Sequence, residues 1–178
     1  IRPFDGSADG TFVMILSGAR NIRIEHNTAF PGKCILVASG APSQGVVYRN
    51  NISPHNTYGI FGDSKGPGLP AINTYFPGGA ITRNVMYGQG IEAIYPPGNF
   101  FPAGIEAVGF TDPAKKMYAL TAKSKFKSAG TDRRDLGADM GLLELVEADV
   151  VSGRLPQASV LQSAVKRALQ AVQRNPKP

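Results

Sequence analysis

Few residues in this 178-residue chain have the types and spacing that catalysis requires. His26 and His55 are its two histidines, and each is interpreted as a hydrogen-bonded turn residue because no carboxylate cluster stands at a matching position. Cleavage of a sugar chain needs paired carboxylates, or a base beside a charge-neutralising cation, and neither set recurs along one strand position. No nucleophile-elbow or phosphate-loop motif occurs. The sequence therefore assigns no catalytic residue and leaves open whether the chain is an enzyme.

Metal-binding patterns are equally sparse. Asp5, Ser7 and Asp9 alternate as in a calcium loop, but Leu16 stands where that loop needs a bidentate Glu, so a turn is the better interpretation. Cys34 is the single cysteine and is expected to be a small buried hydrophobe. The residues themselves predict no metal site and no cofactor.

Three short stretches share one pattern, in which a β-type run, an asparagine and a second β-type run follow one another. The asparagines are Asn27, Asn51 and Asn84, which are 24 and 33 residues apart. Such spacings fall within the roughly 20–50 residues that indicate stacked repeats. Equivalent turns stacked one strand spacing apart can join their amides, since each amide has two donors and two acceptors. We therefore predict an asparagine ladder formed by these three side chains.

The residues flanking the asparagines support the same alignment. Three positions earlier, the aligned residues are Ile24, Tyr48 and Ile81. One position later, they are Thr28, Ile52 and Val85. Both sets suit strand interiors. Glu25 and Arg49 also align, which predicts an exposed ion pair between neighbouring strands.

These runs resemble the rungs of right-handed parallel β-helix proteins of the pectate-lyase-like (pectin lyase-like) superfamily. Residues 108–139 are similar to the closing coil of many bacterial members, with Gly-Phe-x-Asp-Pro, Tyr-x-Leu, Ser-Ala-Gly-Thr-Asp and Leu-Gly-Ala-Asp in that order. The chain departs from this pattern at Lys125 and at Lys115-Lys116. The resemblance covers about residues 11–140 and implies an all-β fold, a right-handed parallel β-helix (solenoid) with a C-terminal cap. Residues 95–107 are expected to close one end of the stack.

Two parts of the chain are predicted, with residues 1–141 forming the coils and cap and residues 142–178 forming a linker and a terminal amphipathic α-helix. From Pro156 onward, the apolar residues fall on one helical face. They are Leu161, Val165, Ala168, Leu169 and Val172. Asn175-Pro176 is expected to end this helix.

A Gly- and Pro-rich stretch, residues 59–70, lengthens the interval between the second and third asparagines and predicts an inserted loop. Loops inserted into repeats often bind ligands. The residues near this loop whose rings and charges suit a sugar are Tyr58, Asp63, Lys65, Tyr75 and Phe76. The alternative is a surface loop without a binding function.

The net charge of +6 comes largely from the C-terminal third. Nucleic acid is not an expected partner, because no aromatic residues are interleaved with the basic ones and no binding motif occurs. An acidic polysaccharide fits better, and the alternative is that the basic residues only form a solvated surface. No apolar run approaches the ~20 residues that span a bilayer, so no membrane span is predicted. The protein is expected to be a monomer.

The resemblance implies a secreted bacterial protein, extracellular or periplasmic, whose terminal part binds or processes polysaccharide in the manner of a lyase or glycoside hydrolase. The alternative is a non-catalytic structural, adhesin-like or glycan-binding solenoid. Calcium is implied by the resemblance alone. The first residue is Ile and no signal peptide is present, so the chain is expected to be a piece of a longer protein.

Overall fold

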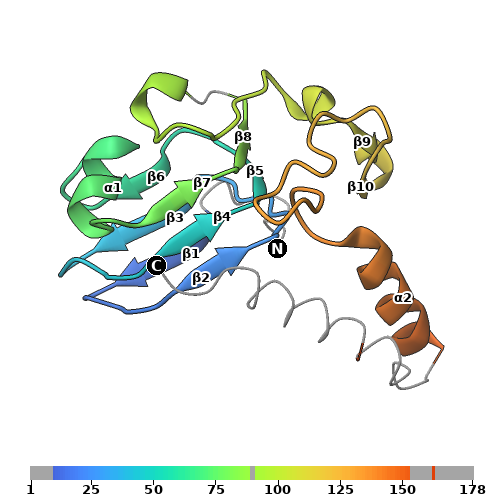
Figure 1. The fold of residues 1–178 in the computed structure, drawn as a ribbon, viewed down its shortest axis with the longest axis horizontal. Helices are drawn as coiled ribbons and strands as arrows, with labels where there is room; N and C mark the ends of the chain where they lie inside the picture. Colours follow the sequence, from blue (N-terminus) through green and yellow to red (C-terminus); the bar gives the residue numbers. More distant parts are fainter. Residues whose placement is uncertain (1–9, 89–90, 153–161, 163–178) are drawn as a thin grey trace. The chain divides into compact units, whose positions relative to one another are not determined.

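A computed structural model describes residues 10–88, 91–152 and 162 of the chain (Figure 1). The chain divides into two units, Ile1–Ala138 and Asp139–Pro178. Each unit is described by itself below.

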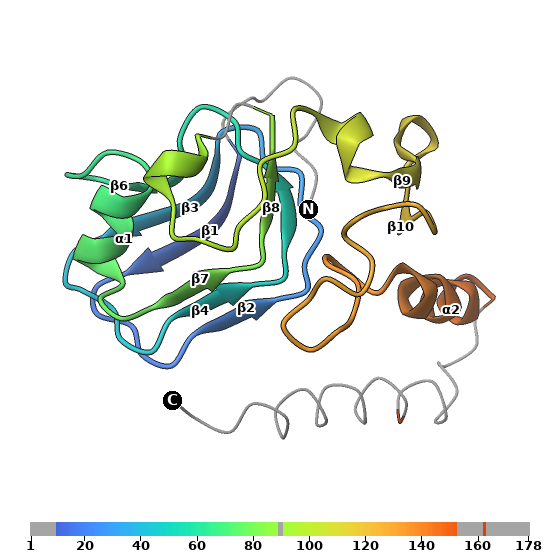
Figure 2. The same cartoon turned by 45° about the horizontal axis from the view of Figure 1, so that its top comes forward.

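Within residues 11–87, the first unit forms three small parallel sheets (Figures 1 and 2). The first sheet has the order β1 (Thr11–Leu16), β3 (Cys34–Ser39) and β6 (Gly59–Gly62). The second has the order β2 (Arg23–Glu25), β4 (Val47–Arg49) and β7 (Ala80–Thr82). The third pairs β5 (Ile52–Pro54) with β8 (Val85–Tyr87).

The strand register confirms both sets of aligned flanking residues. Ile24 pairs with Tyr48, and Tyr48 pairs with Ile81. Thr28 bridges to Ile52, which pairs with Val85. Tyr48 and Ile81 are buried, as an inward-facing strand position requires.

The remainder of the first unit is not built from parallel strands. β9 (Phe110–Asp112) and β10 (Met117–Leu120) form an antiparallel pair. The described residues of this unit also form 3-10 helices at η1 (Glu92–Ile94), η2 (Ile105–Val108) and η3 (Pro113–Lys115). An α-helix, α1 (Leu69–Tyr75), packs against β6 and β3 (Figure 2).

The expected fold class, an all-β right-handed parallel β-helix, is therefore wrong. The described residues form short strands in small separate sheets, parallel and antiparallel, together with two α-helices, which is a small mixed α/β arrangement. The expected closing coil at 108–139 contains the antiparallel β9–β10 pair, because η3 and the left-handed Lys116 (φ 66°) reverse the chain after Asp112. The asparagine-marked turns predict the parallel pairing of the strands that flank them, and they do not predict the arrangement of the rest of the chain.

The loop expected at residues 59–70 is instead β6, a turn and the start of α1. Pro70 stands in the first turn of α1, where its missing N–H costs nothing. Gly68 precedes the helix with φ 76°, and a Cβ there would overlap the backbone of Ile94. Ala71, Ile72 and Tyr75 are buried, so tertiary packing stabilises this seven-residue helix.

Two apolar clusters form the core of the first unit. The larger lies between the sheets and α1, and its largest fully buried side chains include Tyr48, Phe76, Ile35 and Leu36. The smaller joins Ile52 and Val85 to aromatic residues of the 100–126 region, including Phe110 and Phe126. The 100–138 region therefore packs as part of the same unit as the parallel sheets.

The second unit contains α2 (Met140–Val151), where a linker was expected. The Asp139 carboxylate caps its start by accepting a 3.0 Å hydrogen bond from the Leu142 N–H. The amphipathic helix predicted from Pro156 onward lies outside the described residues apart from Gln162, and its amphipathic packing is not tested. Within the described part of the chain, no helix has the length and apolarity needed to cross a bilayer.

Candidate functional site

Four asparagine side chains form one hydrogen-bonded ladder, which extends the predicted three by one. Asn27 donates from Nδ2 to Asn51 Oδ1 at 2.9 Å, and Asn51 donates in the same way to Asn84 Oδ1 at 3.0 Å. Asn84 in turn donates from Nδ2 to Asn99 Oδ1 at 3.0 Å. At each step the backbone N–H of the donating asparagine also bonds to the same oxygen. The last three asparagines are buried, and Asn27 is partly exposed.

A left-handed residue precedes every asparagine of the ladder. These residues are His26 (φ 53°), Asn50 (φ 59°), Arg83 (φ 55°) and Gly98 (φ 85°). Asn and His are among the side chains that tolerate this conformation best, and Gly adopts it freely. The turn brings the His26 and Asn50 side chains together, with Asn50 Nδ2 3.2 Å from His26 Nε2.

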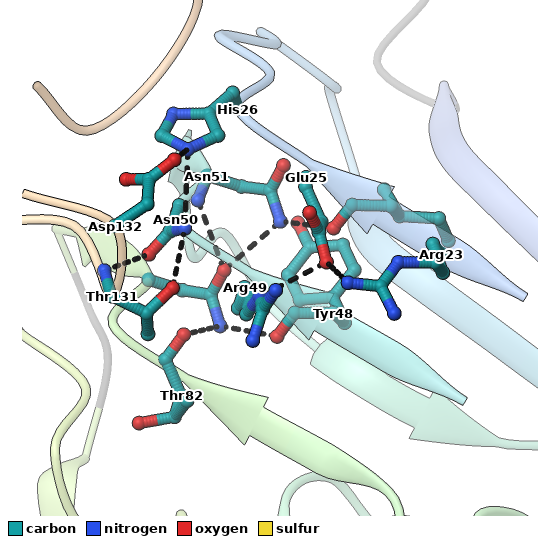
Figure 3. A network of polar contacts seen from close by, with 12 residues as sticks. Arg23, Glu25, His26, Tyr48, Arg49, Asn50, Asn51, Thr82, Thr131 and Asp132 are labelled. Atoms are coloured by element: carbon teal, nitrogen blue, oxygen red, sulfur yellow. Dashed lines mark hydrogen bonds and ion pairs between the residues drawn. The ribbon is translucent and has the colours of Figure 1, made fainter. Parts of the chain in front are cut away.

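His26 has a partner at each ring nitrogen, and Figure 3 shows the contacts at Nε2. Nδ1 lies 3.1 Å from the Asp135 carbonyl oxygen, which only accepts, so Nδ1 carries a proton. Nε2 lies 3.0 Å from Asp132 Oδ2. If Nε2 is protonated it donates to this carboxylate, and if it is not, it accepts from Asn50 Nδ2. In both states the imidazole ties the turn to the 132–135 segment and is not a free base.

The Asp132 carboxylate stays ionised in this cluster. Burial would raise its pKa, but hydrogen bonds from Arg134, together with the nearby His26 and Arg134 charges, outweigh burial and lower the pKa. Arg134 Nε donates to Oδ2 at 2.6 Å. The side chains of His26 and Asp132 are each 14% exposed, so the pair is largely shielded from solvent.

Asn50 binds the same segment from the neighbouring turn (Figure 3). Its Oδ1 accepts from the Thr131 N–H at 3.0 Å, and its Nδ2 donates to Thr131 Oγ1 at 3.0 Å. Its carbonyl oxygen accepts from the Gly137 N–H at 2.8 Å. The turn sequence at 128–132 was recognised from the chain, but its role as a clamp on the asparagine turns was not.

Charged side chains of β2 and β4 form ion pairs on the side of the second sheet opposite the buried Tyr48 (Figure 3). Glu25 Oε1 is 2.9 Å from Arg23 Nη2 and 2.9 Å from Arg49 Nε. The predicted pairing of Glu25 with Arg49 is confirmed, but these side chains are only 18% and 12% exposed. The pair is therefore better shielded from solvent than an ordinary surface ion pair.

The five residues predicted to contact a sugar divide into two groups. Tyr75 and Phe76 are 5% and 1% exposed and belong to the core, so their rings are not available to a ligand. Tyr58 is 37% exposed, and its ring centroid lies 5.2 Å from that of Phe61. Asp63 and Lys65 are exposed on the turn that follows β6.

The exposed group belongs to one side of the first sheet, here called the outward face. Strand alternation places Met14, Val37 and Phe61 there in one paired row. Met14 is 62% exposed. Asp63 follows the end of β6, and its carboxylate bonds to Ser39 Oγ, two residues after Val37 on β3, so it lies on the same side. Phe61 and Val37 were not singled out from the sequence, although the alternation of β3 and β6 would have placed them opposite their buried neighbours.

The Asp63 carboxylate is fixed in position. Oδ2 accepts from Ser39 Oγ at 2.6 Å, and Oδ1 accepts from Tyr75 Oη at 2.5 Å. These hydrogen bonds lower the pKa of Asp63. Although its ring is buried, Tyr75 therefore contributes to the outward face through its hydroxyl group.

His55 belongs to a separate buried contact. Its Nε2 lies 2.7 Å from Tyr95 Oη, its Nδ1 lies 2.8 Å from the Asn56 carbonyl oxygen, and Tyr95 Oη also accepts from the Ile60 N–H at 3.1 Å. The carbonyl contact requires that Nδ1 donates, so in the neutral imidazole Nε2 accepts from the tyrosine hydroxyl. Burial lowers the pKa of His55 and raises that of Tyr95 to about 12.

Among the described residues, no group of three or more His, Cys, Asp or Glu side chains could hold a metal ion. Cys34 is buried, and burial raises the pKa of its thiol. Comparisons with known protein families, with curated proteins and with solved structures found no match. The resemblance to pectate-lyase-like proteins therefore rests on the sequence motifs alone.

Proposed function

We propose that the first unit binds polysaccharide on its outward face. The observation that carries the proposal is the ring pair of the exposed Tyr58 and the half-buried Phe61 beside the fixed carboxylate of Asp63. Two residues of extended chain span at most about 7 Å, so the Phe61 ring and the Asp63 carboxylate are within reach of one sugar unit.

Each part of this face has a defined role in the proposal. The apolar face of a sugar ring packs on the aromatic rings, which offer a large rigid surface. A sugar hydroxyl donates to the Asp63 carboxylate, which is already oriented by Ser39 and Tyr75. Lys65, exposed two residues later, supplies a positive charge for the carboxylate of an acidic sugar.

Binding is favoured over cleavage because the best-placed reactive groups are already engaged. Both oxygens of Asp63 accept hydrogen bonds from hydroxyl groups. Glu25 is in two ion pairs. Both nitrogens of His26 have partners. An extracellular or periplasmic location is part of the same proposal, since polysaccharides are met there.

The direct test is binding to a panel of neutral and acidic glycans by titration calorimetry. Tyr58→Ala should weaken binding about tenfold or more, and Tyr58→Phe, which keeps the ring, should change it by less than about twofold. Asp63→Asn should weaken binding to both glycan classes. If Tyr58→Ala binds as the unaltered protein does, the outward face is not the site.

The charge of the sugar is tested separately. Lys65→Ala should weaken binding of acidic glycans and leave neutral glycans unaffected. Lys115→Ala is the matched control, because its side chain is 78% exposed on a different segment. Equal losses for Lys65→Ala and Lys115→Ala would indicate nonspecific attraction and not a site. Release of new reducing ends from a bound glycan would overturn the non-catalytic assignment.

A further inference from the structure

The asparagine ladder has a direction, and one of its ends is incomplete. Asn51 Oδ1 receives two hydrogen bonds from Asn27, through the backbone N–H at 3.0 Å and through Nδ2 at 2.9 Å. Asn84 Oδ1 receives the same two bonds from Asn51. No group among residues 10–88 and 91–152 donates to Asn27 Oδ1. The first member of the ladder is thus an acceptor without the two donors that each later member has.

A backbone N–H group one residue after Asn27 also lacks a partner among the described residues. The Ile52 N–H donates to the Asn27 carbonyl oxygen at 2.8 Å, and the Val85 N–H donates to the Asn51 carbonyl oxygen at 2.8 Å. Thr28 is the equivalent residue of the first ladder position, and its N–H has no acceptor within the described ranges. The next N–H, that of Ala29, donates to the Ile52 carbonyl oxygen at 3.0 Å. The Thr28 N–H therefore points away from the second ladder position.

β1 and β2 precede Asn27 in the chain, and each is the edge strand of its sheet on the side of the first ladder position. β1 is the outer strand of β1-β3-β6, and β2 is the outer strand of β2-β4-β7. An outer strand presents a row of backbone donors and acceptors that can pair with another strand. With Asn27 and Thr28, these two strands form a continuous polar edge, here called the β1–β2 edge.

We propose that the β1–β2 edge binds an extended polypeptide segment in which a short β-run is followed by a left-handed residue and an asparagine. The segment runs parallel to β2, as β4 does on the other side. Its asparagine donates from its N–H and Nδ2 to Asn27 Oδ1. Its asparagine carbonyl accepts from the Thr28 N–H. The carbonyl three residues earlier shares one Asn27 Nδ2 hydrogen with Glu25 O, as Tyr48 O and Thr82 O share one from Asn84 Nδ2 at 2.9 and 3.1 Å.

Two other occupants fit this edge less well. Residues 1–9 of the chain contain no asparagine, so they lack the paired donors that Asn27 Oδ1 requires. A second copy stacked head to tail would have to offer Asn99, which is 6% exposed and so is already covered. A copy related by a two-fold axis would place one Asn27 Oδ1 against the other, acceptor against acceptor. Residues 153–178 contain one asparagine, Asn175, which follows the predicted helix and not a β-run and stands directly before Pro176. A separate polypeptide segment with the required pattern therefore fits the edge better than any of these candidates.

The test uses the full chain and a labelled, end-blocked peptide that copies residues 43–54, a segment that already contains the required pattern. Its matched control is the same peptide with Asn51→Asp, which has almost the same shape but presents oxygen where the donor stood. Fluorescence anisotropy should show saturable binding with a Kd of roughly 10–100 µM and at least about tenfold weaker binding of the control. Equal binding of both peptides, or none up to roughly 1 mM, would overturn the proposal.

Hydrogen exchange locates the bound peptide without altering the protein. The Thr28 amide should become protected when the peptide binds, and the Ala29 amide, already bonded to Ile52, should change little. Peptide binding without protection of Thr28 would place the peptide elsewhere and refute the proposal. Asn27→Leu should abolish binding, and if this variant does not fold, the two peptides and the exchange data still decide. Tyr58→Ala should leave peptide binding unchanged, so failure here is distinct from failure of the glycan proposal.

Discussion

Replacing Asn51 by alanine should be among the most destabilising single changes at the asparagine turns. Its Oδ1 accepts from the N–H and Nδ2 of Asn27, and its Nδ2 donates to Ile24 O and Asn84 Oδ1, which makes four hydrogen bonds. At about 1 kcal/mol net for each bond, the loss is ~4 kcal/mol. Water reaches the partly exposed Asn27 and recovers part of this, so we expect Asn51→Ala to lower the free energy of unfolding by ~3–4 kcal/mol.

Asn27→Ala is the matched control, since it removes the same chemical group from the open end of the ladder. It deletes only the bonds from Nδ2 to Glu25 O and to Asn51 Oδ1, and the Asn27 N–H still serves Asn51. The expected loss is ~1–2 kcal/mol. Urea unfolding followed by tyrosine fluorescence measures both variants, and all six tyrosines lie in the first unit, so the signal reports on that unit alone. Equal losses for the two variants would refute a ladder whose interior is more tightly bonded than its open end.

Three further results are expected from the same unfolding assay. Burial lowers the folded pKa of His55 below its unfolded value of about 6.5. Stability should therefore fall as the pH drops below about 6.5, by at most ~1.4 kcal/mol per pH unit, and His55→Gln should flatten this slope. Gly137→Ala should cost more than Gly78→Ala, because both have positive φ but only at Gly137 would the new Cβ meet Thr28 Oγ1. Asp132→Asn should destabilise the protein at pH 7 by ~1–2 kcal/mol and by less at pH 3, because the lowered pKa of this carboxyl gives stability that is lost as pH falls.

The ladder could be predicted because its signal is local and repeats. An asparagine between two β-type runs needs only about eight residues to be recognised, and the flanking residues set the strand register. Asn99 was missed because it follows Asn84 by 15 residues and is preceded by Pro96-Pro97 and not by a strand. The available signal was Gly98-Asn99-Phe100, which repeats the left-handed residue, the asparagine and an apolar residue. Phe100 indeed bridges to Val85.

The helix α1 could not be predicted from periodicity. Seven residues give barely two turns, which is too short for a 3.6-residue pattern to be distinguished from chance. The surrounding glycines and prolines indicated a loop. The helix depends on burying Ala71, Ile72 and Tyr75, and that burial is decided by strands far away in the chain. For the same reason, Tyr75 and Phe76 were wrongly expected to be available to a ligand.

The contact between His26 and Asp132 was also beyond sequence reasoning. The two residues are 106 positions apart, and a lone histidine beside a turn gives no indication of its partner. The expectation that each histidine is a hydrogen-bonded turn residue is confirmed at His26, but its role as an anchor for the 131–138 segment came only from the structure. Long-range polar contacts of this kind carry no periodic signal that a single sequence reveals.

The two proposed surfaces share β1 but use different parts of it. A glycan on the outward face would contact side chains such as Met14, which stand perpendicular to the sheet. A peptide on the β1–β2 edge would use backbone groups that lie in the plane of the sheet. The directions are perpendicular, so one ligand does not occupy the other's site.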